Sequence, residues 1–204
     1  ASDVYKRQAI PGILHLTPSK MKTLTVLYVP GMDQRKEMIV NPWNNTYLQR
    51  GMNCLVIDGP GQGESLMREI WVDEENYAEA GRAAIDFLER RPEVDADKIG
   101  LFGRSMGSYW APLIAIKDSR VKALATAFGC YYDKHHIFNE TSPNFRLRFM
   151  WMAGVDNDED FDKMISPMTL EGREKHIRCP YIIFHGELDH LTSARETYSY
   201  FDKL

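Results

Sequence analysis

The sequence predicts an α/β protein, with a mainly parallel sheet that carries helices on both faces. Short apolar segments alternate with longer segments of helical periodicity, which is the order that a parallel sheet with crossover helices requires. Loops rich in glycine or in charged residues follow the apolar segments, where ligands bind in such sheets. At 204 residues the chain is long enough for one domain with a sizeable core.

Three strands are expected early in the chain because β-branched, aromatic and aliphatic residues gather there. They cover residues 10–16, 23–29 and 54–57. Between the last two we expect a helix over about residues 35–50, broken or delayed by Pro42 and ended by Gly51.

The rest of the chain continues the alternation. Apolar residues at helical spacing predict a helix over residues 75–90, and further helices are expected at 109–117 and 193–204. Apolar runs at 121–128 and 181–184 predict two more strands.

A strand that ends near Phe102 is followed by Gly103-Arg104-Ser105-Met106-Gly107 and then directly by a helix. Gly-x-Ser-x-Gly occurs by chance in many loops, but the order strand, turn, helix is typical of a nucleophile elbow. The two glycines keep side chains away from the crowded backbones of strand and helix. We therefore predict Ser105 as a nucleophile, with the amide of Met106 facing the developing oxyanion.

Composition excludes several classes of partner. A net charge of −4 with no basic excess argues against nucleic acid, and no apolar run is long enough to span a bilayer. The three cysteines, Cys54, Cys130 and Cys179, are odd in number and widely spaced, which is typical of buried thiols in a reducing, cytoplasmic compartment.

Both ends of the fold are expected to be truncated. Residues 3–8 resemble the translation of an adapter used in sequencing libraries, so residues 1–8 are expected to be a non-native lead-in, and residues 9–204 the core of the fold. The sequence stops within the helix expected at 193–204.

About fifty residues separate the strands expected at 121–128 and 181–184, too many for a plain crossover. The segment 131–177 is rich in aromatic residues and methionines and carries an acidic run at 156–162. It is predicted to be a lid over the site. The alternative is a small satellite core with a solvated acidic face, and the two are compatible.

A serine nucleophile needs a base and an acid that orients the base. Asp189, just after the strand at 181–184, is the predicted acid; the alternative is a turn aspartate that stabilises its own loop. Asp133 is the fallback acid.

The base is the missing member of this triad. His190 directly follows Asp189 and could hardly be held by it. The remaining histidines are poor substitutes: His15, His135, His136, His176 and His185. We expect His185 to be structural, and the base to lie beyond residue 204.

A second oxyanion donor is expected from the loop after the strand at 23–29, where the amide of Met32 follows Pro30-Gly31. The alternative is an ordinary turn. The glycine-rich stretch 58–63 lacks the features of a phosphate-binding loop and is expected to be a tight turn beside the site. No spacing suggests a metal, and no cofactor is expected.

Three motifs together resemble the α/β-hydrolase superfamily, over the stretch from Ile10 to Leu204. They are Asp58-Gly-Pro-Gly-Gln-Gly-Glu-Ser65, Gly103-Arg-Ser-Met-Gly107 and His185-Gly-Glu-Leu-Asp189. Within it, the chain is most similar to the branch of 2,6-dihydroxypseudooxynicotine hydrolase and fungal polyketide-shortening hydrolases. That similarity is carried by Pro30-Gly31-Met32-Asp33, Tyr109-Trp110-Ala111-Pro112 and residues 148–156.

The resemblance implies Ser105 as nucleophile, Asp189 as acid, and the amides of Met32 and Met106 as oxyanion hole. It also implies that the bond hydrolysed is either an ester or a carbon–carbon bond next to a ketone. Members of the branch carry an N-terminal helical cap and a C-terminal histidine loop, and this sequence shows neither.

The sequence thus predicts a serine-type hydrolase of a small-molecule carbonyl substrate, with association into a homo-oligomer left open. The alternatives are a simple carboxylesterase or peptidase-like hydrolase and, from another class, a non-catalytic binding protein that keeps the hydrolase scaffold.

Overall fold

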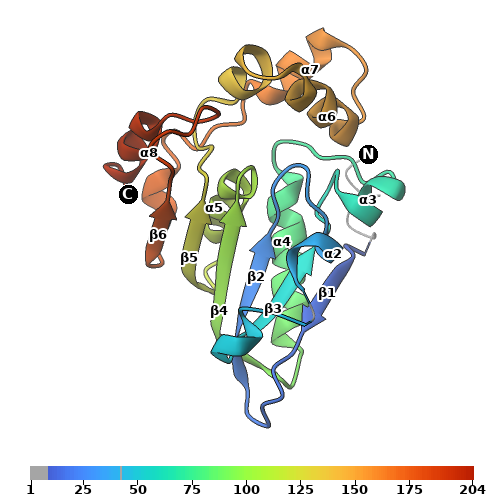
Figure 1. Cartoon of the computed structure of the whole chain (residues 1–204), viewed down its shortest axis with the longest axis vertical. Coiled ribbons are helices and arrows are strands. Elements are labelled where there is room, and N and C mark those ends of the chain that lie inside the picture. The colour runs from blue at the N-terminus through green and yellow to red at the C-terminus, as the bar shows by residue number, and fades with distance from the viewer. Residues whose placement is uncertain (1–8, 42) are drawn as a thin grey trace.

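The computed structural model describes residues 9–41 and 43–204, so the expected lead-in at 1–8 and the helix break at Pro42 lie outside the described residues. Six strands form one sheet in the order β1-β3-β2-β4-β5-β6 (Figure 1). They are β1 (Gly12–His15), β2 (Thr23–Val29), β3 (Asn53–Ile57), β4 (Val94–Arg104), β5 (Val121–Ala127) and β6 (Tyr181–Phe184). β1 runs antiparallel to β3 and the other pairs are parallel, which confirms the predicted mainly parallel sheet.

The helices follow the expected alternation. They are α2 (Lys36–Ile39), α3 (Gly63–Met67), α4 (Asn76–Glu89), α5 (Gly107–Lys117), α6 (Pro143–Ala153), α7 (Asp158–Ile165) and α8 (Ala194–Phe201), with short helical turns η1 (Leu48–Arg50), η2 (His136–Glu140) and η3 (Glu174–His176). Side-chain caps start several of them: the oxygens of Ser142, Asn157 and Ser193 accept backbone N–H groups at the starts of α6, α7 and α8.

The helix expected over residues 35–50, broken or delayed at Pro42, forms only as two short pieces, and Gly51 ends the second piece in the left-handed conformation, as expected. Among the described residues of this range, α2 and η1 alone are helical. The side-chain oxygen of Asn45 accepts the N–H groups of Tyr47 and Leu48, at 2.9 and 3.2 Å. This bonding starts a new turn instead of continuing the helix, as asparagine side chains commonly do.

The two faces of the sheet are covered unequally. Leu27, Leu101 and Leu124 lie in register across β2, β4 and β5 and belong to the large core formed with α4 and α5. The opposite face holds a smaller cluster, in which Tyr28 and Val56 pack beside the end of α2. The core therefore lies mainly between the sheet and the α4–α5 layer.

The segment between β5 and β6 carries α6 and α7 and lies across the carboxyl ends of the strands (Figure 1). Its rings Phe138, Phe149 and Phe161 are fully buried and pack against one another. Phe149 also stacks near Trp110 of α5, with ring centroids 6.4 Å apart. The aromatic residues thus extend the main core instead of forming a separate one.

In the part of the chain that the structure describes, no helix has both the length and the apolar character needed to cross a membrane.

Candidate active site

Ser105 occupies the sharp turn between β4 and α5. Its φ is 54°, in the left-handed region that non-glycine residues seldom adopt. Its N–H donates to the carbonyl of Ala127 in β5 at 2.8 Å, and its own carbonyl accepts the N–H of Ser108 at 2.7 Å. The strained turn is therefore held from both sides, as a nucleophile elbow requires.

The two glycines of the motif are required by close backbone contacts. A Cβ on Gly103 would lie 2.2 Å from the carbonyl oxygen of Gly107, and a Cβ on Gly107 would lie 2.2 Å from that of Val29. Both neighbours are backbone atoms, which cannot rotate away. The elbow packs at this spacing only with glycine at both positions.

A small cavity of about 40 Å³ brings the four predicted site residues together. Ser105, Asp189, Met32 and Met106 all line it. The fallback acid Asp133 does not: it is exposed, and its Oδ1 accepts the N–H of His136 at 3.1 Å.

Asp189 has one oxygen engaged within its own loop. Its Oδ1 accepts the N–H groups of Leu191 and Thr192, at 2.8 and 3.4 Å. Among the described residues, Oδ2 has no hydrogen-bond donor. Asp189 can therefore stabilise its own loop through Oδ1 and still have Oδ2 available to orient a base.

None of the described histidines forms a hydrogen bond with the hydroxyl of Ser105. His185 lies at the end of β6, where its Nε2 is 3.0 Å from the carbonyl oxygen of Thr192. It thus supports the loop that carries Asp189, in keeping with the structural role expected for it.

The loop after β2 lies directly against Ser105. A Cβ on Gly31 would be 3.1 Å from the Cβ of Ser105, a tighter contact than side chains usually make. Next to this loop an open groove of about 830 Å³ runs over α2, α3 and α6, and Met32 lines both this groove and the cavity at Ser105. Exposed Met38, Met67 and Trp151 also line the groove.

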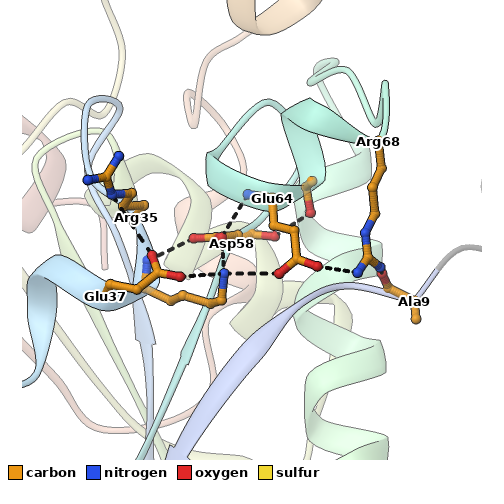
Figure 2. Close-up of polar contacts among 8 residues, drawn as sticks. Ala9, Arg35, Glu37, Asp58, Glu64 and Arg68 are labelled. Carbon is orange, nitrogen blue, oxygen red and sulfur yellow. Dashed lines mark hydrogen bonds and ion pairs between the residues drawn. The ribbon is translucent and has the colours of Figure 1, made fainter.

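A buried ion pair joins the loop after β2 to the loop after β3 (Figure 2). The carboxylate of Asp58 is fully buried and accepts both the ammonium and the backbone N–H of Lys36, each at 2.7 Å. Glu37 and Glu64 lie 2.8 and 3.3 Å from the same ammonium. Burial opposes the charge on Lys36, but these carboxylates outweigh it and raise the pKa of the ammonium above its ordinary range.

Two buried residues at the site were missed by the sequence reasoning. Gln62 Nε2 donates to the carbonyl of Gly31 at 2.6 Å, and the hydroxyl of Tyr77 donates to Gln62 Oε1 at 2.6 Å. The stretch 58–63 forms a turn beside the site, as expected. No pattern in its residues, however, predicts the hydrogen bond from Gln62 to Gly31, thirty-one residues away.

Two of the three thiols, those of Cys54 and Cys130, are poor candidates for a nucleophile. Cys54 and Cys130 are buried, and burial raises their pKa to about 12 and about 11. Within residues 9–41 and 43–204, no cluster of three or more histidine, cysteine or acidic side chains could hold a metal ion.

Comparison with known proteins agrees with this geometry. The model of the prolyl oligopeptidase family matches residues 39–204. The chain belongs to the prolyl oligopeptidase family. Among curated relatives it is 31% identical over 167 residues to 2,6-dihydropseudooxynicotine hydrolase of Paenarthrobacter nicotinovorans, an alignment that covers 80% of this chain and 44% of that protein.

A second relative of this family member is alpha/beta hydrolase pydG of an Acremonium species, 28% identical over 75% of this chain and 38% of that protein. The chain therefore spans less than half the length of these two relatives. The crystal structure of 2,6-dihydroxy-pseudo-oxynicotine hydrolase superposes with a TM-score of 0.81 at 22% identity, covering 95% of this chain and 54% of that one. This likeness confirms the α/β-hydrolase fold.

Proposed function

We propose that this member of the prolyl oligopeptidase family is a serine hydrolase that acts on a small-molecule carbonyl compound, with Ser105 as nucleophile. One observation carries the proposal: a serine in a left-handed elbow shares a cavity with an aspartate and with the two residues whose amides would form the oxyanion hole. The family membership and the hydrolase names of the relatives support it.

In this mechanism the hydroxyl of Ser105 attacks the carbonyl carbon and gives its proton to a histidine base. The N–H groups of Met32 and Met106 stabilise the oxyanion of the tetrahedral intermediate. The intermediate expels the leaving group, which takes up the proton, and water then hydrolyses the acyl-enzyme. Because none of the described histidines is hydrogen-bonded to the hydroxyl of Ser105, we propose that the base lies in chain beyond Leu204.

The walls of the cavity suggest what the acyl group is like. Ile137, Phe138 and Phe145 come from the segment between β5 and β6 and form an apolar side of the cavity. We infer that this segment, 131–177, is a lid and that the acyl group is apolar. The bond cleaved is either an ester or a carbon–carbon bond next to a ketone.

Hydrolysis of p-nitrophenyl esters by the complete gene product tests the proposal. We expect turnover that Ser105→Ala abolishes. Asp189→Asn should lower kcat by roughly 10³–10⁴-fold, the loss expected when a triad acid can no longer orient its base. Asp133→Asn, the matched control, should leave kcat unchanged. A folded protein without Ser105-dependent turnover would favour the non-catalytic binding protein.

A further inference from the structure

The peptide that joins Gly31 to Met32 has both of its polar atoms at the site. Its carbonyl oxygen belongs to Gly31 and its N–H to Met32, which is the proposed oxyanion donor. The bond is trans, so the C=O and the N–H point in opposite directions from one rigid plane. Whatever holds the carbonyl of Gly31 therefore also fixes the direction of the Met32 N–H.

Gln62 holds that carbonyl together with the backbone N–H of Gln34, which donates to it at the longer distance of 3.1 Å. Gln62 Nε2 donates to the oxygen of Gly31 at 2.6 Å, and the side chain is buried, with the residue only 2% exposed. A carbonyl oxygen can only accept a hydrogen bond, so the amino end of the Gln62 amide must face it. The carbonyl end of the amide then faces the opposite way.

Tyr77 occupies that opposite side. Its hydroxyl donates to Gln62 Oε1 at 2.6 Å, which locks the side-chain amide in the orientation that Gly31 needs. Tyr77 is completely buried, and burial raises the pKa of its hydroxyl, so it stays a proton donor. A Cβ on Gly59 would lie 2.2 Å from the Tyr77 ring, so glycine at position 59 gives the ring its space.

The ring of Tyr77 in turn lies on the elbow helix. It stacks on Trp110 of α5 with ring centroids 4.1 Å apart and an angle of 5° between the planes. Trp110 lies one helical turn after Met106, and its backbone N–H donates to the carbonyl oxygen of Met106 at 3.3 Å. The buried path from Trp110 through Tyr77 and Gln62 to Gly31 thus links the elements that carry the two proposed oxyanion donors.

The geometry points to Gln62 and Tyr77 as positioning residues that set the direction of the Met32 N–H toward the oxyanion. This inference rests on the proposed function, because it assigns the Met32 amide a part in catalysis. Neither side chain lines the cavity at Ser105, and Gln62, which lines the neighbouring groove, is only 2% exposed there. Both are therefore assigned to act through the Gly31–Met32 peptide and not on the substrate.

The test uses the complete gene product and a fluorophosphonate probe, with the labelling rate resolved into kinact and an apparent KI. Gln62→Met keeps the size of the side chain and removes its hydrogen bonds. We expect a ~10- to 100-fold fall in kinact, below the 10²–10³-fold loss seen when an oxyanion donor is removed outright. KI should not change, because only the transition state uses the oxyanion donor.

Tyr77→Phe is the second variant, since it keeps the stack on Trp110 and removes only the hydroxyl. We expect a smaller fall in kinact, again at constant KI. Tyr181→Phe is the matched control: it also removes a buried hydroxyl, bonded to Thr126 at 2.9 Å, but away from the cavity. It should leave both constants unchanged.

A second readout does not depend on activity. The protein is labelled with glycine that carries ¹³C at the carbonyl and with methionine that carries ¹⁵N, so that an NMR experiment across the peptide bond detects only Gly–Met peptides. This sequence has two of them, Gly31–Met32 and Gly51–Met52. Met32→Leu identifies the first signal by its loss. In Gln62→Met and Tyr77→Phe we expect the Gly31 carbonyl signal to move upfield as its hydrogen bond weakens, while that of Gly51 stays in place.

The outcomes are separable. If wild-type protein is not labelled at Ser105, the proposed function fails, and an unmoved Gly31 signal in the variants would overturn the positioning role as well. If wild-type protein is labelled and both folded variants react at the wild-type rate with unmoved Gly31 signals, the positioning role is wrong and the proposed function stands.

Discussion

The ammonium of Lys36 lies 2.7 Å from Oδ2 of Asp58, and the aspartate is fully buried at the end of β3 (Figure 2). Asp58 also accepts the N–H of Glu64 at 2.9 Å, so one carboxylate fixes the start of α3 and the start of α2 together. The loop after β2, which carries the proposed oxyanion donor, is thus anchored to a rigid strand end.

Removal of the cation should therefore destabilise the protein. Lys36→Met leaves the Asp58 carboxylate buried without its ionic partner, and we expect a loss of about 3–5 kcal/mol in the free energy of unfolding. Arg68→Met removes the exposed partner of Glu64 and should cost less than about 1 kcal/mol. Urea denaturation measures both. A loss for Lys36→Met no larger than that for Arg68→Met would contradict this account of the pair.

A single added methyl group should destabilise the protein at Gly103 of β4 but not at Gly100 of the same strand. Gly103→Ala places a Cβ 2.2 Å from a backbone oxygen, so we expect a loss of about 1–3 kcal/mol or more together with loss of Ser105 reactivity. At Gly100 the nearest atom is 3.6 Å away, so Gly100→Ala should keep both. Thermal denaturation and probe labelling of the two variants decide the point.

The left-handed backbone at Ser105 should cost stability. Ser105→Gly and Ser105→Ala both remove the hydroxyl, but only glycine adopts a φ of 54° without strain. We expect the glycine variant to be more stable than the alanine variant by about 1 kcal/mol, measured by urea denaturation. Equal stabilities would mean that the turn is not strained.

Glu75 links α4 to two cations, Lys117 in α5 and Arg173 in the segment before β6. Burial opposes ionisation of Glu75, but the hydrogen bonds from both cations outweigh it and lower the pKa of the carboxyl below its ordinary value of 4.5. The unfolded chain therefore takes up the proton first as pH falls. The stabilisation is present above pH 4.5 and is lost as pH falls through the folded-state pKa.

Glu75→Gln should accordingly flatten the acid side of the stability profile. Urea midpoints measured between roughly pH 6 and pH 3 should fall less steeply for the variant than for the wild type. Glu79→Gln, which removes an exposed partner of Arg82, serves as control and should keep the wild-type slope. An unchanged slope for Glu75→Gln would show that the two cations do not hold this carboxylate in solution.

The sequence predicted those structural features that depend on residues close together in the chain. The strands at 23–29 and 181–184 have the predicted bounds because their β-branched and aromatic residues favour extended backbone. The elbow was predictable because the Gly-x-Ser-x-Gly pattern stands between a strand and a helix, and Gly103 marks a backbone contact within the turn. The helix expected at 35–50 is reduced to two short pieces, and the sequence pattern did not show that the side chain of Asn45 accepts the backbone N–H groups that begin the second one.

Contacts between distant segments gave no such signal. Gln62 meets Gly31 across thirty-one residues and Tyr77 across fifteen, and neither pairing follows from periodicity or turn chemistry. The cavity that joins Ser105 to Asp189 was foreseen only through the rule that loops at the carboxyl ends of parallel strands meet.

We propose that the fold makes Ser105 a reactive nucleophile by the position that it gives this side chain. The most direct test of this proposal is mass spectrometry of the complete gene product after treatment with a fluorophosphonate, followed by mapping of the modified peptide. We expect one adduct, on Ser105, which is absent from Ser105→Ala and from protein unfolded in urea before treatment. A folded protein that carries no adduct on Ser105, under conditions in which a control serine hydrolase reacts fully, would contradict it.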